Sequence, residues 1–226
     1  MADRPVLLVH GFATSAERTW REPGWIDLLT EAGRPVIAPD LLGHGDAPKP
    51  HDPAAYAHLE ARVLEALPDE PVDAIGYSLG GRTLLALAAA HPERFHRLVV
   101  AGVGANLFRE DRGSAIADAI EGEDDPEHLV TQHFRQLAHA PGNDPAALAA
   151  CMRRPVRPLT GEDLAAVAMP VLVVVGDQDF VLPVDPLMDA LPDGRLVVLR
   201  HVDHFGTPKD MTFIDEALGF LDARPF

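Results

Sequence analysis

Ser78 stands between glycines two positions away on either side, in the stretch GYSLGG. A serine hydroxyl is a weak nucleophile, so it needs a neutral imidazole to take its proton and a carboxylate to orient that imidazole. The two glycines are what a sharp strand-to-helix turn requires, because larger side chains would collide there while the serine points outward. The stretch therefore predicts a nucleophilic serine. The alternative is a turn that needs the two glycines only for its backbone conformation and has no catalytic role.

Two later stretches supply candidate partners for this serine. GDQD contains Asp177 and Asp179, and RHVDHF contains His201 and His204. The order Ser, Asp, His along the chain is the order expected for a serine displayed on such a turn. His201 sits at the end of an apolar run, whereas His204 lies in the loop that follows, which favours His204 as the base.

Short apolar runs alternate with helical stretches along most of the chain. The runs are uninterrupted, which is typical of strands buried on both faces. They lie at 5–9, 35–38, 72–76, 97–102, 170–176 and 195–199, and the helical stretches between and after them include 53–67, 79–93 and 210–223. This alternation predicts an α/β fold, a mostly parallel sheet of about six strands with helices on both faces. Ligands then bind beyond the carboxyl ends of the strands, where the candidate residues stand.

Residues 104–168 interrupt the alternation with several short helical patterns and no strand-like run. In the pattern at 126–140, five residues share one helical face: Leu129, Val130, His133, Phe134 and Leu137. Thr160 and Asp163 have the spacing of a capping box at the start of a helix. We expect a small helical lid inserted into one domain that spans 1–226.

Composition excludes several classes of function. A formal net charge of −16 disfavours nucleic acid and anionic membranes as partners. Cys151 is the only cysteine, and no spacing matches a zinc site or a phosphate-binding glycine loop, so we expect no metal and no cofactor. Neither a signal peptide nor a membrane-spanning run is recognisable, and a cytoplasmic protein is expected.

The chain resembles the α/β-hydrolase family over nearly its whole length. The resemblance rests on HGF, PDLLGHGDAP, GYSLGG, GDQD and the final HF. Two features depart from the family pattern. The usual opening pair of strands is absent, and Ala47 stands where a serine often follows Gly-His-Gly-x.

Carried over residue by residue, the resemblance implies a catalytic triad and an oxyanion hole. Ser78 is the nucleophile, His204 the base, and Asp179 the orienting acid, because the family spacing G-x-x-D selects Asp179 over Asp177. The backbone N–H groups of Leu79 and Phe12 would form the oxyanion hole. His10, beside that loop, is expected to be packed and hydrogen-bonded.

The resemblance also implies a substrate class, a small-molecule carboxylic ester or lactone cleaved through an acyl-enzyme intermediate. A small apolar pocket is expected, with Phe12, Phe134, Phe180 and Phe205 as the nearest aromatic candidates. Acyl chains up to about eight carbons should fit best. Serine at the turn disfavours dehalogenases and epoxide hydrolases of this fold, which use aspartate there.

Two other functions remain open at this stage. GYSLGGR also resembles the nucleophile turn of menaquinone-pathway lyases, in which Arg82 could hold a carboxylated substrate, although the final HF does not match those enzymes. The second is a ligand receptor, because hormone sensors with intact triads are built on this fold. Multiple turnovers of a simple ester would exclude a pure receptor.

Overall fold

Six parallel strands form one sheet in the computed structural model, which describes residues 4–109, 113–123 and 128–225. The strands are β1 (Val6–Val9), β2 (Val36–Ile37), β3 (Val72–Tyr77), β4 (Phe95–Ala101), β5 (Val171–Gly176) and β6 (Gly194–Leu199). Each overlaps one of the six apolar runs, and every neighbouring pair is parallel, so the predicted sheet is confirmed.

The strand order is β2-β1-β3-β4-β5-β6. The chain runs from β1 outward to β2 and then returns to place β3 on the other side of β1. The order therefore reverses between β1 and β3, and the loops that follow these two strands diverge there. Such a reversal is where open parallel sheets place their ligands.

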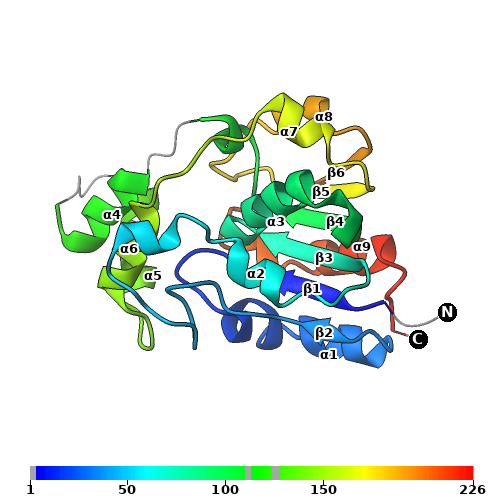
Figure 1. Ribbon diagram of the computed structural model, residues 1–226, viewed down its shortest axis with the longest axis horizontal. Helices are drawn as coiled ribbons and strands as arrows, with labels where there is room; N and C mark the ends of the chain where they lie inside the picture. The colour runs from blue at the N-terminus through cyan, green and yellow to red at the C-terminus, as the bar shows by residue number, and fades with distance from the viewer. Residues whose placement is uncertain (1–3, 110–112, 124–127, 226) are drawn as a thin grey trace.

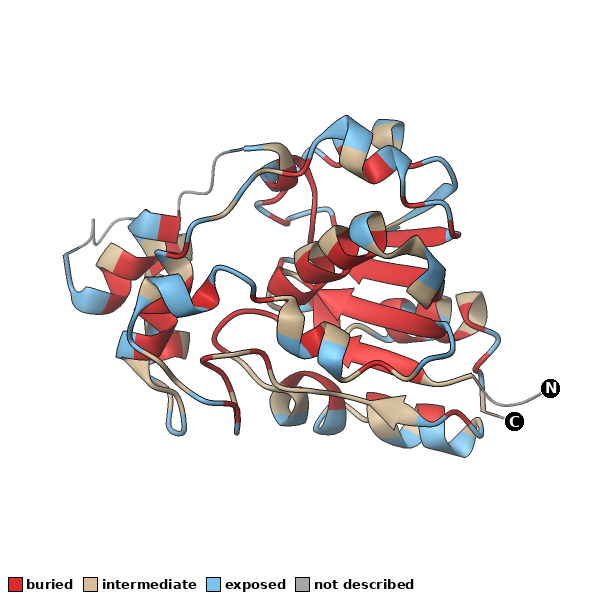
Figure 2. Cartoon of the chain, viewed as in Figure 1, coloured by how far each residue is buried: buried red, intermediate tan, exposed pale blue. Residues whose placement is uncertain are grey.

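Successive residues of the central strands pack into two separate apolar layers. Val6 and Leu8 belong to one layer, together with Trp20 and Trp25, while Leu7 faces the other. Figure 2 shows strands β1, β3 and β5 buried along their whole length. Helices must cover both faces of such a sheet, because each face is apolar.

Two helices cover one face of the sheet, α1 (Trp25–Glu31) and α9 (Met211–Phe220). Four helices pack on the other face (Figure 1): α2 (Ala61–Glu65), α3 (Leu79–Ala90), α7 (Gly161–Ala165) and α8 (Asp185–Ala190). Short helical turns complete the connections: a π-helical turn η1 (Glu17–Arg21), and 3₁₀ turns η2 (Pro53–Tyr56), η3 (Pro92–Arg94), η4 (Ala105–Phe108) and η5 (Thr207–Lys209). Helices α3 and α9 correspond to the stretches predicted at 79–93 and 210–223.

Between β4 and β5, the described residues form helices and no strand. They include α4 (Gly113–Glu121), α5 (Leu129–Ala138), α6 (Pro145–Met152) and the already named α7. Figure 1 shows α4, α5 and α6 grouped beyond the carboxyl ends of β1 and β3. The predicted capping box is present, since Thr160 Oγ1 accepts from Asp163 N and Asp163 Oδ2 accepts from Thr160 N.

Three details of the sequence interpretation were wrong. The stretch 53–67 is not one helix, because Tyr56 is buried and donates its hydroxyl to Pro50 O, which fixes a separate 3₁₀ turn before α2. Leu129 is 81% exposed at the start of α5, outside the buried face. Strand β6 is an edge strand with Val198 49% exposed, so it is not buried on both faces.

Across the described ranges, no helix combines the length and the apolar character needed to cross a membrane.

Candidate active site

Ser78 occupies the turn that joins β3 to α3. Its φ of 54° is unusual for a residue with a side chain, and its N–H donates to Ala101 O at 2.8 Å. A Cβ at Gly76 would lie 2.8 Å from backbone atoms of Gly80 and Gly81, and one at Gly80 would collide with Val9 O. Only glycine fits at both positions, which explains why glycines stand two residues before and two residues after Ser78.

The turn brings Ser78 to a histidine and an aspartate from distant parts of the chain. Nε2 of His204 lies 2.9 Å from Ser78 Oγ, and Nδ1 of the same ring lies 3.0 Å from both carboxylate oxygens of Asp179. Asp179 and His204 are buried, whereas Ser78 is half-buried. The imidazole thus has a carboxylate at one nitrogen and a hydroxyl at the other, the arrangement that nucleophilic serine catalysis needs.

Backbone and side-chain hydrogen bonds fix both partners of the serine. Asp179 Oδ1 also accepts from Val181 N at 3.0 Å, which orients the carboxylate. The hydroxyl of Tyr77 donates to His204 O at 2.7 Å. Burial raises the pKa of Tyr77 well above its usual value, so the hydroxyl remains a donor. Tyr77 lies inside the GYSLGG stretch, yet its supporting role was not predicted.

Asp177 and His201, the alternative candidates for the acid and the base, take part in a different hydrogen bond. Asp177 Oδ1 accepts the backbone N–H of His201 at 2.8 Å, and this bond joins the loops that follow β5 and β6. His201 itself is exposed, with a φ of 60°. Among the described residues, no hydrogen bond links either side chain to Ser78.

The loop after β1 passes beside the serine. A Cβ on Gly11 would lie 3.5 Å from the Cβ of Ser78, so Phe12 follows directly at the site. Within the described part of the chain, no protein acceptor takes the backbone N–H of Phe12 or of Leu79. Leu79 begins α3, where unpaired N–H groups and the helix dipole favour negative charge.

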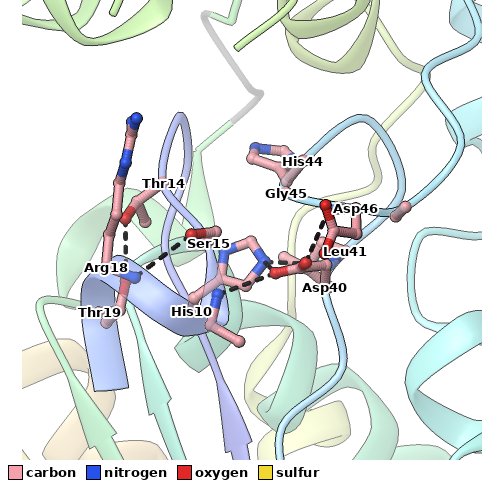
Figure 3. A network of polar contacts seen from close by, with 12 residues as sticks. His10, Thr14, Ser15, Arg18, Thr19, Asp40, Leu41, His44, Gly45 and Asp46 are labelled. Carbon is pink, nitrogen blue, oxygen red and sulfur yellow. Dashed lines mark hydrogen bonds and ion pairs between the residues drawn. The ribbon is translucent and has the colours of Figure 1, made fainter. Parts of the chain in front are cut away.

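A buried polar network holds this loop in place (Figure 3). His10 Nδ1 donates to Gly11 O at 2.7 Å, while Nε2 accepts from Leu41 N at 3.0 Å. Asp40 Oδ1 is 3.5 Å from Nε2, but burial lowers the pKa of His10, so this contact joins a neutral ring to a carboxylate and is no ion pair. His10 is thus packed and hydrogen-bonded, away from the reacting groups.

The carboxylate of Asp40 ties two loops together in the same network. It accepts from Ala16 N and from Asp46 N, both at 2.8 Å. A side chain at Gly45 would collide with this carboxylate, which accounts for the glycine there. The PDLLGHGD stretch therefore has a structural role beneath the HGF loop.

A cavity of about 380 Å³ opens at Ser78 and His204. Three of the predicted aromatic residues line it, Phe12, Phe134 and Phe205. Phe180 does not line it, although its ring centroid lies 4.3 Å from that of His204. The cavity wall also contains His133, which the sequence placed on the helical face of Phe134, and four polar residues that the sequence did not single out because they belong to no motif: Thr14, Arg18, Glu22 and Lys209.

Arg82 does not line the cavity at Ser78. Its Nη2 donates to Arg157 O at 2.8 Å, and its side chain lines a second cavity on the outer side of α3. The expectation that Arg82 helps hold a substrate at the serine therefore lacks structural support. In the described ranges, no group of three or more His, Cys, Asp or Glu side chains is arranged to hold a metal ion.

Comparisons with known proteins identify the family. A sequence model of the α/β hydrolase fold family matches residues 4–139. The pimeloyl-[acyl-carrier protein] methyl ester esterase of Neisseria meningitidis serogroup B is 31% identical over 233 residues, covering 90% of this chain and 86% of that protein. The 2-hydroxymuconate semialdehyde hydrolase of Pseudomonas sp. (strain CF600) is 36% identical over 124 residues, covering 52% and 42%.

Solved structures show the same fold. A hydrolase from Pseudomonas aeruginosa PA01 has a TM-score of 0.71 and 26% identity, covering 99% of this chain and 92% of that one. A marine microorganism esterase has a TM-score of 0.69 and 20% identity, covering 97% and 96%. With over half of its residues matched by the family's sequence model and a 31% identical relative aligned over most of its length, this chain belongs to the α/β-hydrolase family.

Proposed function

We propose that this protein is a serine hydrolase that cleaves carboxylic esters or lactones. One observation carries the proposal: the His204 ring lies within hydrogen-bond distance of Ser78 Oγ through Nε2 and of Asp179 through Nδ1. Similarity to an esterase over most of the chain supports the same reaction class.

In the proposed reaction, Ser78 Oγ attacks the ester carbonyl carbon while His204 Nε2 takes the hydroxyl proton. The N–H groups of Phe12 and Leu79 stabilise the oxyanion of the tetrahedral intermediate. Collapse of this intermediate breaks the bond to the alcohol oxygen, and His204 returns the proton to the leaving alcohol. His204 then takes a proton from a water molecule, whose oxygen attacks the acyl carbon. The bond from the acyl carbon to Ser78 Oγ breaks, His204 returns the proton to Oγ, and the acid is released. Asp179 keeps the imidazole oriented and stabilises its cation.

The proposed substrate has a short to medium acyl chain. A cavity of about 380 Å³ is near the lower end of the volumes of small-molecule sites. Each buried methylene contributes about 0.8 kcal/mol only while the cavity has room, so the gain should stop near about eight carbons. In this proposal residues 104–168 act as a lid of a single domain, and α5 contributes Phe134 and Leu137 to the cavity wall. The proposed setting is cytoplasmic, with a small-molecule ester as partner and no cofactor.

Hydrolysis of a carbon–carbon bond is the second candidate. It is favoured by the alignment of half of this chain with 2-hydroxymuconate semialdehyde hydrolase. Arg18 and Lys209 in the wall of the Ser78 cavity would suit an anionic substrate, in a chain whose net charge is −16.

Steady-state kinetics on p-nitrophenyl esters, from acetyl to palmitoyl, test the proposal. We expect many turnovers per chain, with kcat/KM greatest at or below octanoyl. Asp179→Asn should lower kcat by about 10³- to 10⁴-fold, because the imidazole loses the carboxylate that fixes its tautomer. Asp177→Asn is the matched control and should keep most activity, since the described hydrogen bond of the Asp177 side chain goes to the His201 backbone N–H and not to the catalytic candidates.

Four outcomes would count against the proposal. Binding of esters without turnover would indicate a receptor. Equal, mild effects of the two aspartate variants would place the acid elsewhere. Activity that still rises at palmitoyl would show an acyl tunnel larger than the cavity at Ser78. Cleavage of 2-hydroxymuconate semialdehyde in preference to every ester would favour the second candidate.

A further inference from the structure

A second cavity, of about 460 Å³, lies on the outer side of α3. Its walls come from α3, from residues 56–60 and from the irregular segment 154–159 that precedes α7. The cavity at Ser78 and this one share no lining residue. The proposed hydrolysis therefore gives this second cavity no role.

Arg154 is the notable group in its wall, because its charged side chain is buried there and no described residue supplies a counter-charge. The residue is only 8% exposed. Its Nη1 donates to Cys151 O at 2.7 Å and lies 3.9 Å from Cys151 Sγ. Within the described residues, no carboxylate oxygen lies within 4.0 Å of its guanidinium. Burial of a charge without an opposite charge is costly, so an anion at this position would stabilise the fold.

The other charged groups of the cavity do not neutralise Arg154. Asp163 pairs with Arg157 at 2.9 Å and also accepts from Thr160, so its charge is already engaged. Glu60 lies 3.8 Å from His58 in a contact near the surface. Arg82 adds a further cation to the wall. A cation-rich cavity is unusual in a chain with 35 acidic and 19 basic residues.

The rest of the wall is largely apolar. Leu59, Val156 and Leu159 line it, and α3 contributes Ala86 and other small side chains that leave the space open. A ligand for this cavity must therefore present both an anionic group and an apolar body. Inorganic ions supply only the first.

We propose that this cavity binds a small organic carboxylate with an apolar tail. The planar guanidinium of Arg154 can donate two parallel hydrogen bonds to a carboxylate, and the tail would pack between α3 and Leu159. A purely structural alternative exists, in which Arg154 only caps the C-terminal carbonyls of α6 through Cys151 O.

Isothermal titration with hexanoate, at constant ionic strength, tests the proposal. Hexanoate should bind the wild-type chain at one site, with at least tenfold higher affinity than hexanamide, which lacks the charge. Arg154→Gln should weaken binding at least tenfold. Ala86→Leu should weaken it similarly by filling the cavity while leaving every charge in place. The matched control is Arg97→Gln, which removes an arginine paired with Asp222 elsewhere and should not change the affinity.

The Ser78 cavity must be excluded as the binding place. Hexanoate should still bind after Ser78 has been phosphonylated, and also in Ser78→Ala. Absence of binding to the wild-type chain would overturn the proposal, as would equal affinity for hexanamide or unchanged affinity in both Arg154→Gln and Ala86→Leu. Tighter binding of inorganic phosphate than of hexanoate would contradict the apolar tail. If Arg154→Gln does not fold, Ala86→Leu alone decides the matter.

Discussion

Ser78 is held with a φ of 54°, and its hydroxyl lies 2.9 Å from His204 Nε2. Such a backbone conformation costs on the order of 1 kcal/mol, and the surroundings must enforce it. Here the enforcement comes from the close approach of Gly76 to Gly80, and of Gly80 to Val9 O. Ser78, the proposed nucleophile, is thus positioned by glycines and a backbone carbonyl that take no part in the proposed reaction.

His44 is a second residue whose properties follow from burial. Burial lowers its pKa to about 3, while Nδ1 donates to Leu42 O at 2.9 Å and Nε2 has no partner among the described residues. Below about pH 6.5 the unfolded chain binds a proton at His44 that the folded chain does not. The stability that His44 contributes is therefore complete above pH 6.5 and is lost as the pH falls toward 3.

We predict that His44→Asn makes the protein less sensitive to acid. The asparagine amide can still donate to Leu42 O but does not titrate. The loss of unfolding free energy between pH 6.5 and pH 4 should be smaller than in the wild type by about 3 kcal/mol. Urea denaturation at several pH values measures this slope. His58→Asn, at an exposed site, is the control and should leave the slope unchanged. An identical slope in His44→Asn would mean that His44 titrates alike in both states.

At the scale of elements, the turn between α5 and α6 is tied to the loop that carries Phe12. Asn143 Nδ2 donates to Ala13 O at 3.0 Å and to Leu137 O at 2.8 Å, so one amide joins that loop to the end of α5. Arg18 reaches the same turn by donating to Pro141 O. The ring centroids of Phe12 and Phe134 lie 5.8 Å apart, and this contact also joins the Phe12 loop to α5. The position of the Phe12 N–H therefore depends on the inserted helices.

We predict that Asn143 is a positioning residue for the proposed oxyanion hole. Asn143→Ala should lower kcat for p-nitrophenyl butyrate about tenfold with little change in KM, because a displaced N–H weakens the transition state more than the bound ester. Asn106→Ala is a matched control, since Asn106 also bonds a backbone group, Gly104 N, but away from this loop. A change confined to KM, or to the melting temperature, would show that Asn143 acts only in substrate binding or stability.

Whether an element could be predicted from the sequence depended on how that element packs. Strands β3 and β5 could be predicted from the sequence because both of their faces are buried, which gives uninterrupted apolar runs. Helix α3 could be predicted because it starts at the glycine turn. Stretch 53–67 has a helical pattern, yet the burial of Tyr56 divides it, and a periodic pattern carries no information about such a long-range constraint. The second cavity could not be predicted from the sequence either. Segment 154–159 has no periodic pattern, and it lines the cavity with α3 only through the tertiary fold.

At the scale of the whole molecule, the candidate site is assembled where parallel strands end. The loop after β1 supplies Phe12, the turn after β3 supplies Ser78, and the loops after β5 and β6 supply Asp179 and His204. Parallel strand order alone predicts this edge of the sheet. It does not predict which of two neighbouring aspartates or histidines faces the serine, because that depends on loop contacts such as Asp177 with the His201 N–H.

Covalent labelling by a fluorophosphonate tests the central claim, an activated nucleophile at Ser78, most directly. Intact-mass measurement should show one phosphonyl group per chain, and peptide mapping should find it on Ser78, because only a serine beside a neutral imidazole attacks phosphorus readily. Ser15→Ala is the matched control for a nearby serine and should be labelled at the wild-type rate. Ser78→Ala should take up no label and should lose ester turnover. Labelling of Ser78→Ala at the wild-type rate, or an unlabelled wild-type chain that still turns over esters, would contradict the account.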